Sequence, residues 1–437
     1  MSTIPMGYIS EVDFSQRSAI RAVLVWGLAA IFYFYELMLL VSPSVMTDDL
    51  TLTFKTSAEQ LGNLSAFYYY AYALMQIPVG LLMDRFGPRI LLTIACAFCT
   101  VGCLIFAYAE VMEVAAVGRF VMGIGGSFAV VGCLKLASLW FPVNRFALLT
   151  GIMVAVGMMG GVFGQEHLVK LVLLVGWRHT ILYGAILGGI LCIVIWMIVS
   201  DQPFKTQSFG RHHSEANKLS VLKGLIQVMK VPQVWVASLY AGLMFVPTTG
   251  FGQLWGVPYF VERYSIEKDV AGGMVSMIFY GWAIGGPLYG VISDWISRRK
   301  SPMAFAAIST LIVMSAILYA PVTIPQMKVL MFLLGAFSSG FILAFSVVRE
   351  INMPILTGTA IGFINTLNNA SGALAQPVVG KLLDQQWNGQ VLNDGAPVYS
   401  LQMYNEALLF LPVCLVLAFV MLPFIKETFC RPKAMDD

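Results

Sequence analysis

Three ionisable residues lie inside long apolar stretches of this sequence: Glu36, Arg119 and Lys135. A charged side chain near the centre of a lipid bilayer costs about 2.5–3.5 kcal/mol on insertion scales, so such residues are functional candidates by default. Because burial disfavours the charged form of a carboxyl group, we interpret Glu36 as a group that takes up and releases a proton. The alternative is a structural carboxylate, held by an ion pair or by hydrogen bonds from neighbouring tyrosines.

Arg119 carries a rigid fork of N–H donors, which suits a carboxylate ligand. We therefore expect Arg119 to bind substrate, with a purely structural tie between two helices as the alternative. Lys135 lies close to the end of its apolar stretch, where a long basic side chain can extend its ammonium to the membrane surface. We interpret Lys135 as a structural residue of this kind.

Neutral polar residues follow two stretches at helical spacing. Ser65, Tyr69, Tyr72 and Gln76 are spaced by 4, 3 and 4 residues, and a stripe with the same spacing begins at Asn365. Such a stripe lies along one face of a helix. We expect it to face a water-filled cavity, with packing against a neighbouring helix as the alternative. The candidate substrate-binding residues are Arg119, Tyr33, Tyr69, Tyr72, Gln76, Thr249, Gln253, Tyr280, Asn365, Asn368, Asn369 and Gln376.

Residues 247–255 interrupt an apolar stretch with one proline and two glycines. This composition is typical of a discontinuous membrane helix, which frees backbone groups near a substrate site at the middle of the bilayer. Trp177 and Trp255 are interpreted differently, as aromatic residues at the membrane–water interface.

A short charged loop occurs twice. Residues 80–89 read GLLMDRFGPR and residues 290–299 read GVISDWISRR, so that Asp294 follows Asp84 by 210 positions. Repeats of this kind indicate two copies of one membrane bundle that face each other across a central site. We expect the charged residues of both loops to hold one side of the molecule shut rather than to bind substrate. These gating residues are Asp84, Arg85, Arg89, Asp294, Arg298 and Arg299.

The elements that must position these residues are membrane-spanning helices. Of the 437 residues, 58% are hydrophobic and only 11% are charged, with a mean hydropathy of +0.80; soluble domains carry about 25% charged residues. A span needs roughly 20 apolar residues. We predict twelve spans, approximately at residues 20–46, 60–82, 90–109, 114–138, 147–172, 179–200, 232–258, 270–292, 302–322, 327–347, 355–383 and 401–425. The predicted fold is an all-α polytopic membrane protein with twelve transmembrane helices in two pseudo-symmetric six-helix bundles.

The longest polar stretch divides the chain. We predict an N-terminal bundle over residues 1–200, a cytoplasmic linker over residues 201–231 with a short amphipathic helix near residues 219–229, and a C-terminal bundle over residues 232–437. Basic residues concentrate on the loops of one side, which the positive-inside rule assigns to the cytoplasm together with both termini. The expected partners are the lipid bilayer, a small-molecule substrate and protons. Nucleic acid is not expected, and we expect a monomer.

No pattern in the sequence is typical of an enzyme or a metal site. Cys96, Cys99 and Cys103 share one helical face inside a predicted span, where free cysteines usually serve as small buried hydrophobic residues. His212 and His213 lie in a charged loop, as expected of a solvated pair. We therefore expect no cofactor, no metal and no enzymatic activity.

Two segments resemble the major facilitator superfamily. Residues 80–89 fit its G-x-L-x-D-R-x-G-x-R loop at every defined position, and residues 118–126, GRFVMGIGG, fit its R-x-x-x-G-x-G pattern. The resemblance covers about residues 20–425 and implies transport by alternating access. The chain also resembles the anion:cation symporter branch, the amino-acid importers of intracellular bacteria and, in residues 118–126, the lysosomal dipeptide carrier of this superfamily.

The anion:cation symporter branch carries a Tyr-x-Asp-Arg motif in its first span, whose Asp is a proton site and whose Arg binds substrate. Glu36 takes the place of this Asp, whereas Leu37 replaces the Arg. The resemblance thus implies proton coupling through Glu36 but no carboxylate clamp in the first span. Residues 157–161, GMMGG, lack the proline of the G-P-x-x-G-G pattern that is usual in proton-driven exporters, which favours import.

We therefore predict a secondary active transporter of the bacterial inner membrane that imports a small polar metabolite together with protons. One arginine holds one carboxylate in a two-pronged contact, and amides offer paired donors and acceptors, so an amino acid or short peptide is the expected substrate. One alternative is a carrier of a polycarboxylate such as a siderophore, with Arg119 and Lys135 as its cationic pair. The other is a proton antiporter that exports metabolites or drugs.

Overall fold

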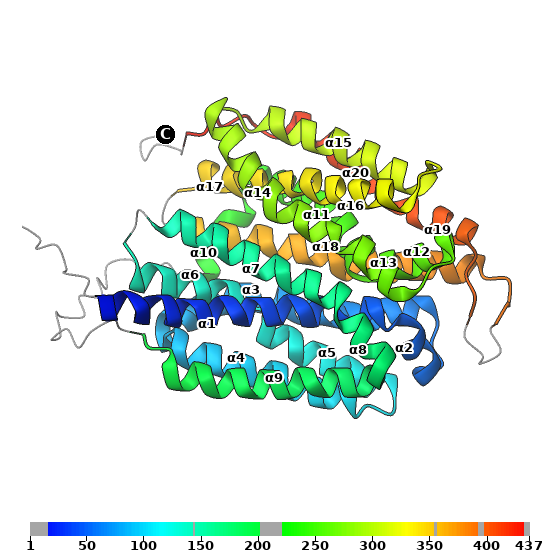
Figure 1. The fold of residues 1–437 in the computed structure, drawn as a ribbon. Helices are drawn as coiled ribbons and strands as arrows, with labels where there is room; N and C mark the ends of the chain where they lie inside the picture. The colour runs from blue at the N-terminus through cyan, green and yellow to red at the C-terminus, as the bar shows by residue number, and fades with distance from the viewer. Residues whose placement is uncertain (1–15, 143–144, 202–220, 354–355, 392–396, 432–437) are drawn as a thin grey trace, which may run out of the picture.

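The computed structural model describes residues 16–142, 145–201, 221–353, 356–391 and 397–431. In these residues the regular elements are helices, apart from one isolated β-bridge between Val391 and Pro397. The long helices run along one common direction, with α1 to α9 on one side and most of the later helices on the other (Figure 1). The predicted all-α class with two helical bundles is confirmed.

The N-terminal bundle consists of helices that are joined by short turns. Its elements are α1 (Gln16–Val41), η1 (Ser42–Val45), α2 (Thr47–Phe54), α3 (Ala58–Phe86), α4 (Pro88–Ala107), α5 (Met112–Gly126), α6 (Ala129–Trp140), α7 (Phe146–Glu166), α8 (Leu168–Val175) and α9 (Trp177–Ile198).

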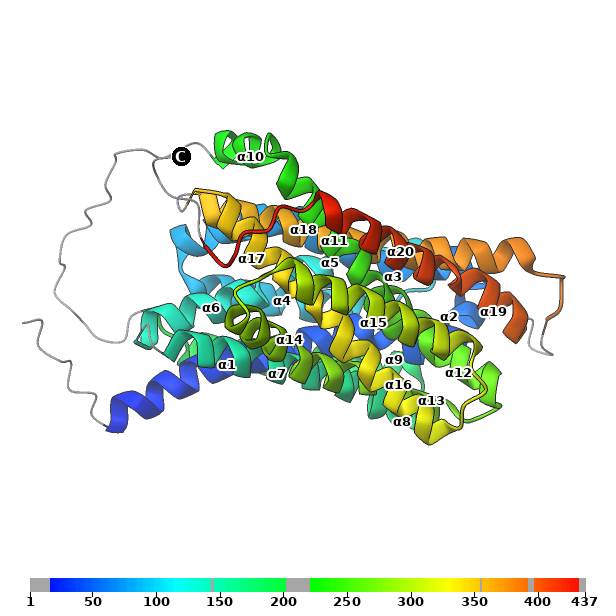
Figure 2. The ribbon, with the colours of Figure 1, turned by 90° about the horizontal axis from the view of Figure 1, so that it is seen from above.

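The C-terminal bundle repeats this arrangement after α10 (Val221–Met229). Its elements are α11 (Pro232–Val246), η3 (Pro247–Trp255), α12 (Gly256–Tyr264), α13 (Lys268–Val275), α14 (Met277–Trp295), α15 (Lys300–Tyr319), α16 (Ile324–Ser338), η4 (Ser339–Phe341), α17 (Ile342–Ile351), α18 (Thr357–Gln386), α19 (Leu401–Leu408), α20 (Phe410–Met421) and η6 (Leu422–Phe424). Helix α10 lies at the edge of the molecule (Figure 2) and occupies part of the predicted linker. Linker residues 202–220 lie outside the described part of the chain.

Ten spans within the described residues are long and apolar enough to cross a membrane by themselves. The remaining two of the twelve predicted spans are α3 and α18, of 29 and 30 residues, which carry the two polar stripes. They pack against each other in antiparallel directions: a Cβ on Gly62 would lie 2.8 Å from the backbone carbon of Gln376. Because each of these helices covers the polar face of the other, neither needs an apolar surface all round.

The predicted interruption at residues 247–255 takes a different form from the one expected. These residues form η3, a buried π-helical segment that continues directly from α11 into α12. Pro247 has no N–H to donate to the preceding turn, and a π-helical turn absorbs such a defect without unwinding the chain. The helix is therefore locally widened rather than broken.

Two tryptophans also differ from their sequence interpretation. Trp177 and Trp255 were expected at the membrane interface, but they are only 6% and 2% exposed. The indole of Trp255 donates a hydrogen bond of 3.0 Å to the carbonyl oxygen of Gln376, and that of Trp177 donates one of 3.2 Å to the hydroxyl of Thr53. Both rings therefore fill gaps between helices.

The long helices define two ends of the molecule. At the terminal end, α1 begins, α9 ends, and the chain leaves η6 (left in Figure 1). At the opposite end lie α2, α12 and α19 with their connecting turns (right in Figure 1).

Candidate functional site

A cavity of about 200 Å³ lies where the two bundles meet. Two other cavities, of about 210 and 690 Å³, lie near the opposite end around Tyr399. We take the central cavity as the candidate site because a fully buried carboxylate, Glu36, forms part of its wall. The lining residues are Tyr33, Glu36, Leu37, Leu40, Tyr68, Tyr69, Tyr72, Val130, Met158, Phe245, Thr248, Gln253, Phe279, Trp282, Phe341, Asn365, Asn368 and Asn369.

Glu36 of α1 is 2% exposed, and its Oε1 accepts a hydrogen bond of 2.6 Å from the hydroxyl of Tyr68 on α3. Gly126 of α5 leaves the space that this pair occupies, since a Cβ there would lie 2.8 Å from the Cγ of Glu36. One side of the carboxyl group is thus fixed by a phenol, while the residue also borders the cavity. This arrangement allows a proton to pass between the carboxyl group and the contents of the cavity.

Arg119 of α5 is fully buried and is not among the residues that line the cavity. Its Nη1 donates a hydrogen bond of 2.8 Å to the carbonyl oxygen of Leu39, and its Nη2 donates one of 3.2 Å to that of Leu40. Its guanidinium carbon lies 4.9 Å from the ring centroid of Tyr68. This geometry fits the structural alternative, a tie from α5 to the end of α1, although Nε has no hydrogen-bond partner.

The cavity brings together seven of the twelve residues predicted to bind substrate. They are Tyr33, Tyr69, Tyr72, Gln253, Asn365, Asn368 and Asn369. Two inter-bundle hydrogen bonds hold its walls: the Tyr69 hydroxyl donates to Oε1 of Gln253, and Nδ2 of Asn365 donates to Oε1 of Gln76 at 2.6 Å. The polar stripes of α3 and α18 therefore face both a cavity and each other.

The other predicted substrate residues lie beside the cavity. Gln376 donates a hydrogen bond of 2.9 Å from Nε2 to the carbonyl oxygen of Thr249, which ties α18 to η3. The Thr249 hydroxyl is turned to the carbonyl oxygens of Phe245 and Val246, both at 3.3 Å. Tyr280 is half-buried on α14, and its neighbour Phe279 lines the cavity instead.

Within the described residues, the side chain of Asn368 in the cavity wall carries a buried polar atom without a hydrogen-bond partner. Asn368 is 4% exposed, and its Oδ1 accepts no hydrogen bond. Nε2 of Gln76, on the neighbouring inter-bundle contact, donates none. Buried polar groups nearly always have a partner in folded proteins. We therefore regard Oδ1 of Asn368 as an acceptor available to a ligand.

The charged loop of the N-terminal bundle is bound to its own bundle. The backbone N–H of Arg89 donates to Oδ1 of Asp201 at 2.7 Å, and its guanidinium donates to the carbonyl oxygen of Trp196 at 2.9 Å while lying over that indole ring. Arg85 is exposed and lies over the ring of Phe86. The side chain of Asp84 lies outside the described residues.

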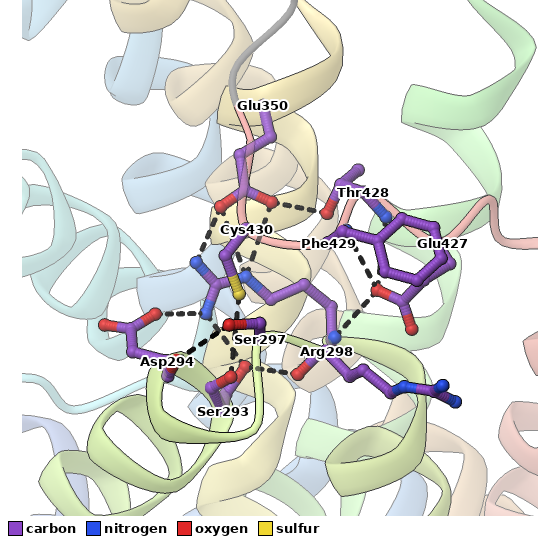
Figure 3. A network of polar contacts seen from close by, with 10 residues as sticks. Ser293, Asp294, Ser297, Arg298, Glu350, Glu427, Thr428, Phe429 and Cys430 are labelled. Atoms are coloured by element: carbon purple, nitrogen blue, oxygen red, sulfur yellow. Dashed lines mark hydrogen bonds and ion pairs between the residues drawn. The ribbon is translucent and has the colours of Figure 1, made fainter.

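The matching loop of the C-terminal bundle forms a denser network (Figure 3). Arg299 is 7% exposed and donates to Oδ1 of Asp294 at 2.7 Å and to Oε1 of Glu350 on α17 at 2.6 Å. Glu427 accepts the backbone N–H groups of Arg299 and Lys300 at 2.8 and 3.0 Å. Burial alone would raise the pKa of Glu427, but these N–H groups hold its pKa below the usual value.

Arg298 does not take part in this network through its side chain, which is exposed and extends away from it (Figure 3). Its carbonyl oxygen accepts a hydrogen bond of 2.7 Å from the hydroxyl of Ser293. Of the three predicted gating residues of this loop, Asp294 and Arg299 are therefore paired with each other.

At the opposite end, the bundles are joined by a carboxylate that caps a helix of the other bundle. Asp384 of α18 accepts the N–H groups of Ala58 and Glu59, the first two residues of α3, at 3.0 and 2.8 Å. The hydroxyl of Tyr399 donates to the same carboxylate at 2.5 Å. A carboxylate at a helix N-terminus is favourable because the free N–H groups carry partial positive charge. We call Asp384, Tyr399 and these two N–H groups the clasp.

The sequence profile of the Major Facilitator Superfamily matches residues 24–376. The chain belongs to the major facilitator superfamily. It is therefore a multi-pass membrane transporter of small molecules and not an enzyme.

Superfamily members of several kinds are similar to this chain. It is 24% identical to the probable sulfoacetate transporter of Cupriavidus necator, with 83% of this chain and 87% of that protein covered. It is also 24% identical to the lysosomal dipeptide transporter of Homo sapiens, covering 79% of this chain and 76% of that protein. Among solved structures, a bacterial homolog of the human lysosomal transporter Spinster, inward-facing and unoccupied, has a TM-score of 0.77 at 16% identity and covers 94% and 99%.

The superfamily patterns located the charged loops but not the carboxylates that hold them. Asp201 and Glu427 each follow the last span of their bundle and accept N–H groups at the start of its third span. A search for repeats at one fixed offset does not find these two carboxylates. Arg299 follows Arg89 by 210 positions, whereas Glu427 follows Asp201 by 226. A carboxylate just after the sixth and twelfth spans was the available signal. The phenylalanine and tryptophan residues of the cavity wall gave no signal, because Phe and Trp are common in any span.

Proposed function

We propose that this transporter is a proton-coupled symporter that imports a small polar metabolite, an amino acid or a short peptide. The observation that carries the proposal is the position of Glu36, a buried carboxyl group in the wall of the central cavity that accepts a hydrogen bond from the phenol of Tyr68. A buried carboxyl group is neutral at a higher pH than an exposed one. Proton uptake and release can therefore follow the opening of the cavity to either side.

The size and the lining of the cavity favour a ligand that is small, polar and without excess negative charge. Drug-sized ligands occupy pockets of about 300–1,000 Å³, and the cavity has about 200 Å³. Its lining, drawn from described residues, includes amides, phenols and the carboxyl group of Glu36, but neither Lys nor Arg. Such a wall satisfies the donors and acceptors of an amino acid or peptide without a fixed cation.

A second candidate is an organic anion, and the relative named for sulfoacetate favours it. In that case protonation of Glu36 leaves the nearby charge of Arg119 without compensation, and this charge attracts the anion. The guanidinium would have to give up its bonds to Leu39 and Leu40 for direct contact.

We further propose that both termini face the cytoplasm of a bacterial cell, that the protein acts as a monomer in the inner membrane, and that residues 1–200 and 232–437 move as two bodies. The excess of Lys and Arg on the loops of the terminal end supports the orientation. The loops with Asp84, Arg85 and Arg89 and with Asp294, Arg298 and Arg299 would then close the cytoplasmic side in the other transport state.

The proposal predicts the behaviour of Glu36→Gln, which removes the titrating group but keeps its size. In proteoliposomes with an inward proton gradient, the wild type should accumulate substrate above the equilibrium level, whereas the variant should reach equilibrium only. Exchange of labelled for unlabelled substrate without a gradient should persist in the variant. The measurement is uptake of radiolabelled amino acids and dipeptides, with sulfoacetate as the competing candidate.

Glu113→Gln is the matched control, because Glu113 is exposed in the first turn of α5 and lies outside the central cavity. It should keep gradient-driven accumulation. Undiminished uphill uptake in Glu36→Gln would remove Glu36 from the coupling mechanism, and uptake of sulfoacetate alone would replace the amino acid by the organic anion.

A further inference from the structure

Three aromatic rings of the C-terminal bundle form one wall of the central cavity. Phe245 of α11, Trp282 of α14 and Phe341 of η4 all line it. Their ring centroids lie 5.4 Å apart for Phe245 and Trp282, 4.9 Å for Trp282 and Phe341, and 5.2 Å for Phe245 and Phe341. Each ring thus packs against the two others, and we call these three residues the aromatic wall.

A hydrogen bond to another cavity residue holds the aromatic wall in place. The indole N–H of Trp282 donates a hydrogen bond of 3.0 Å to the hydroxyl of Thr248 on η3. Trp282 and Phe341 are both 6% exposed, so they are shielded from lipid while they border the cavity. Because the only polar group of the wall is already bonded, the rings offer a ligand apolar contact and no hydrogen bond.

The polar counterpart of the wall lies on α18. Asn368 borders the same cavity, and its buried Oδ1 has no partner. An unpaired buried acceptor destabilises the protein, and a ligand N–H or O–H group placed against it would remove this cost. The cavity therefore combines an apolar aromatic surface with a hydrogen-bond acceptor that a donor group of a ligand can satisfy.

We propose that the C-terminal bundle recognises an amino acid with an aromatic side chain: the ring packs on the aromatic wall, and the ammonium donates to Oδ1 of Asn368. The proposal rests on the proposed function and specifies its substrate. Aromatic rings attract each other beyond their apolar area when their centroids lie 4.5–7 Å apart, which is the spacing within the wall itself. A fourth ring would extend this packing into the cavity.

The test is a set of binding measurements on the purified full-length protein. The probes are L-phenylalanine, L-cyclohexylalanine, which has a saturated ring of similar shape, and 3-phenylpropionate, which lacks the ammonium. L-Phenylalanine should bind at least threefold more tightly than L-cyclohexylalanine and at least tenfold more tightly than 3-phenylpropionate. Equal affinity for the two ring types would overturn the role of the aromatic wall, and tighter binding of 3-phenylpropionate would overturn the role of Asn368.

The ratios between these affinities, measured in variants, distinguish a loss of ligand recognition from a loss of folded protein. Trp282→Leu should reduce the preference for the aromatic over the saturated ring to about one, whereas Phe305→Leu, an exposed ring outside the central cavity, should leave it unchanged. Asn368→Ala should reduce the preference for L-phenylalanine over 3-phenylpropionate. If Trp282→Leu does not fold, Phe341→Leu provides the same comparison, and an unchanged ratio in the folded variant contradicts the proposal.

Failure of this inference differs from failure of the proposed function. Proton-driven uptake of a non-aromatic amino acid, abolished in Glu36→Gln, would reject the aromatic wall as a recognition element and keep the proposed function. Binding of organic anions without any amino acid would reject both. Tight binding of a non-aromatic amine such as L-lysine would assign the wall to a cation, which also binds over aromatic faces, and would overturn the aromatic ligand.

Discussion

The role of a buried arginine depends on the groups around its guanidinium. An arginine can bind a carboxylate, which is why the sequence suggests this role for Arg119. In the structure, however, its two Nη groups donate hydrogen bonds to the carbonyl oxygens of Leu39 and Leu40. These carbonyls belong to the last turn of α1, where such groups lack an intrahelical partner. The arginine thereby stabilises the end of the helix that carries Glu36.

Arg119→Lys is predicted to reduce stability more than ligand binding. A single ammonium cannot reproduce the fork, and one carbonyl oxygen would lose a charge-assisted hydrogen bond of about 1.5–3 kcal/mol. We expect a lower unfolding temperature in detergent, with Arg85→Lys as the control because Arg85 is exposed. Unchanged stability with lost binding would instead support direct contact between Arg119 and the substrate.

At the scale of the element, α3 and α18 carry out two tasks with one interface. Toward the middle of the membrane their stripes border the cavity through Tyr69, Tyr72 and Asn365. At the opposite end, the N-terminus of α3 rests on Asp384 in the clasp. A movement of these two helices would therefore open the cavity and break the clasp together.

Asp384→Asn is predicted to favour opening at the opposite end. The amide keeps one acceptor but loses the charge that stabilises the start of α3, an effect of about 1 kcal/mol, which corresponds to roughly a fivefold change in population. Spin labels can be placed at Lys55 and Val391, which border the cavity of about 690 Å³ at the opposite end, next to the clasp. In the variant, a larger fraction of molecules should show a long distance between the two labels. Asp269→Asn is the control, since its carboxylate accepts an N–H group of its own helix; an equal shift in the control would refute a specific clasp.

At the scale of the whole molecule, the bundles touch mainly at the opposite end. Beyond the clasp, Lys268 of α13 forms an ion pair of 3.0 Å with Asp48, and Gln165 donates to the carbonyl oxygen of Gly252 at 3.0 Å. Toward the terminal end from the cavity, Asn365 donates to Gln76. These contacts of the described residues hold the two bundles together more firmly at the opposite end than at the terminal end.

Gly62→Ala is predicted to slow transport without loss of binding. A Cβ at Gly62 would lie 2.8 Å from the backbone carbon of Gln376, a contact that rigid backbone cannot accommodate, so closure at the opposite end would be impaired. Gly273→Ala is the control because nothing lies within 4 Å of its added Cβ. The uptake rate and the ligand affinity should be measured together; a parallel loss of both in Gly62→Ala would mean that the cavity itself is distorted.

Residue composition and short motifs are enough to predict the membrane environment, the twelve spans, the duplicated bundles and the family. Composition, the length of the apolar stretches and short loop motifs are local properties of the sequence. In a bilayer they constrain the fold strongly, because every backbone polar group must be hydrogen-bonded within the protein. The sequence also indicated Glu36 and the polar stripes as candidate site residues. A polar side chain in an apolar span must face the protein interior or a cavity, because contact with lipid is unfavourable.

Which of these residues contact one another depends on packing between distant parts of the chain. Arg119 faces carbonyl oxygens and not the cavity, Phe245, Trp282 and Phe341 converge from three elements, and Asp384 reaches a helix that begins 326 residues earlier at Ala58. The direction of a side chain around its helix, and the neighbour that it finds there, depend on how the two bundles pack. That packing joins positions far apart in the chain, and no local pattern of residue types specifies it.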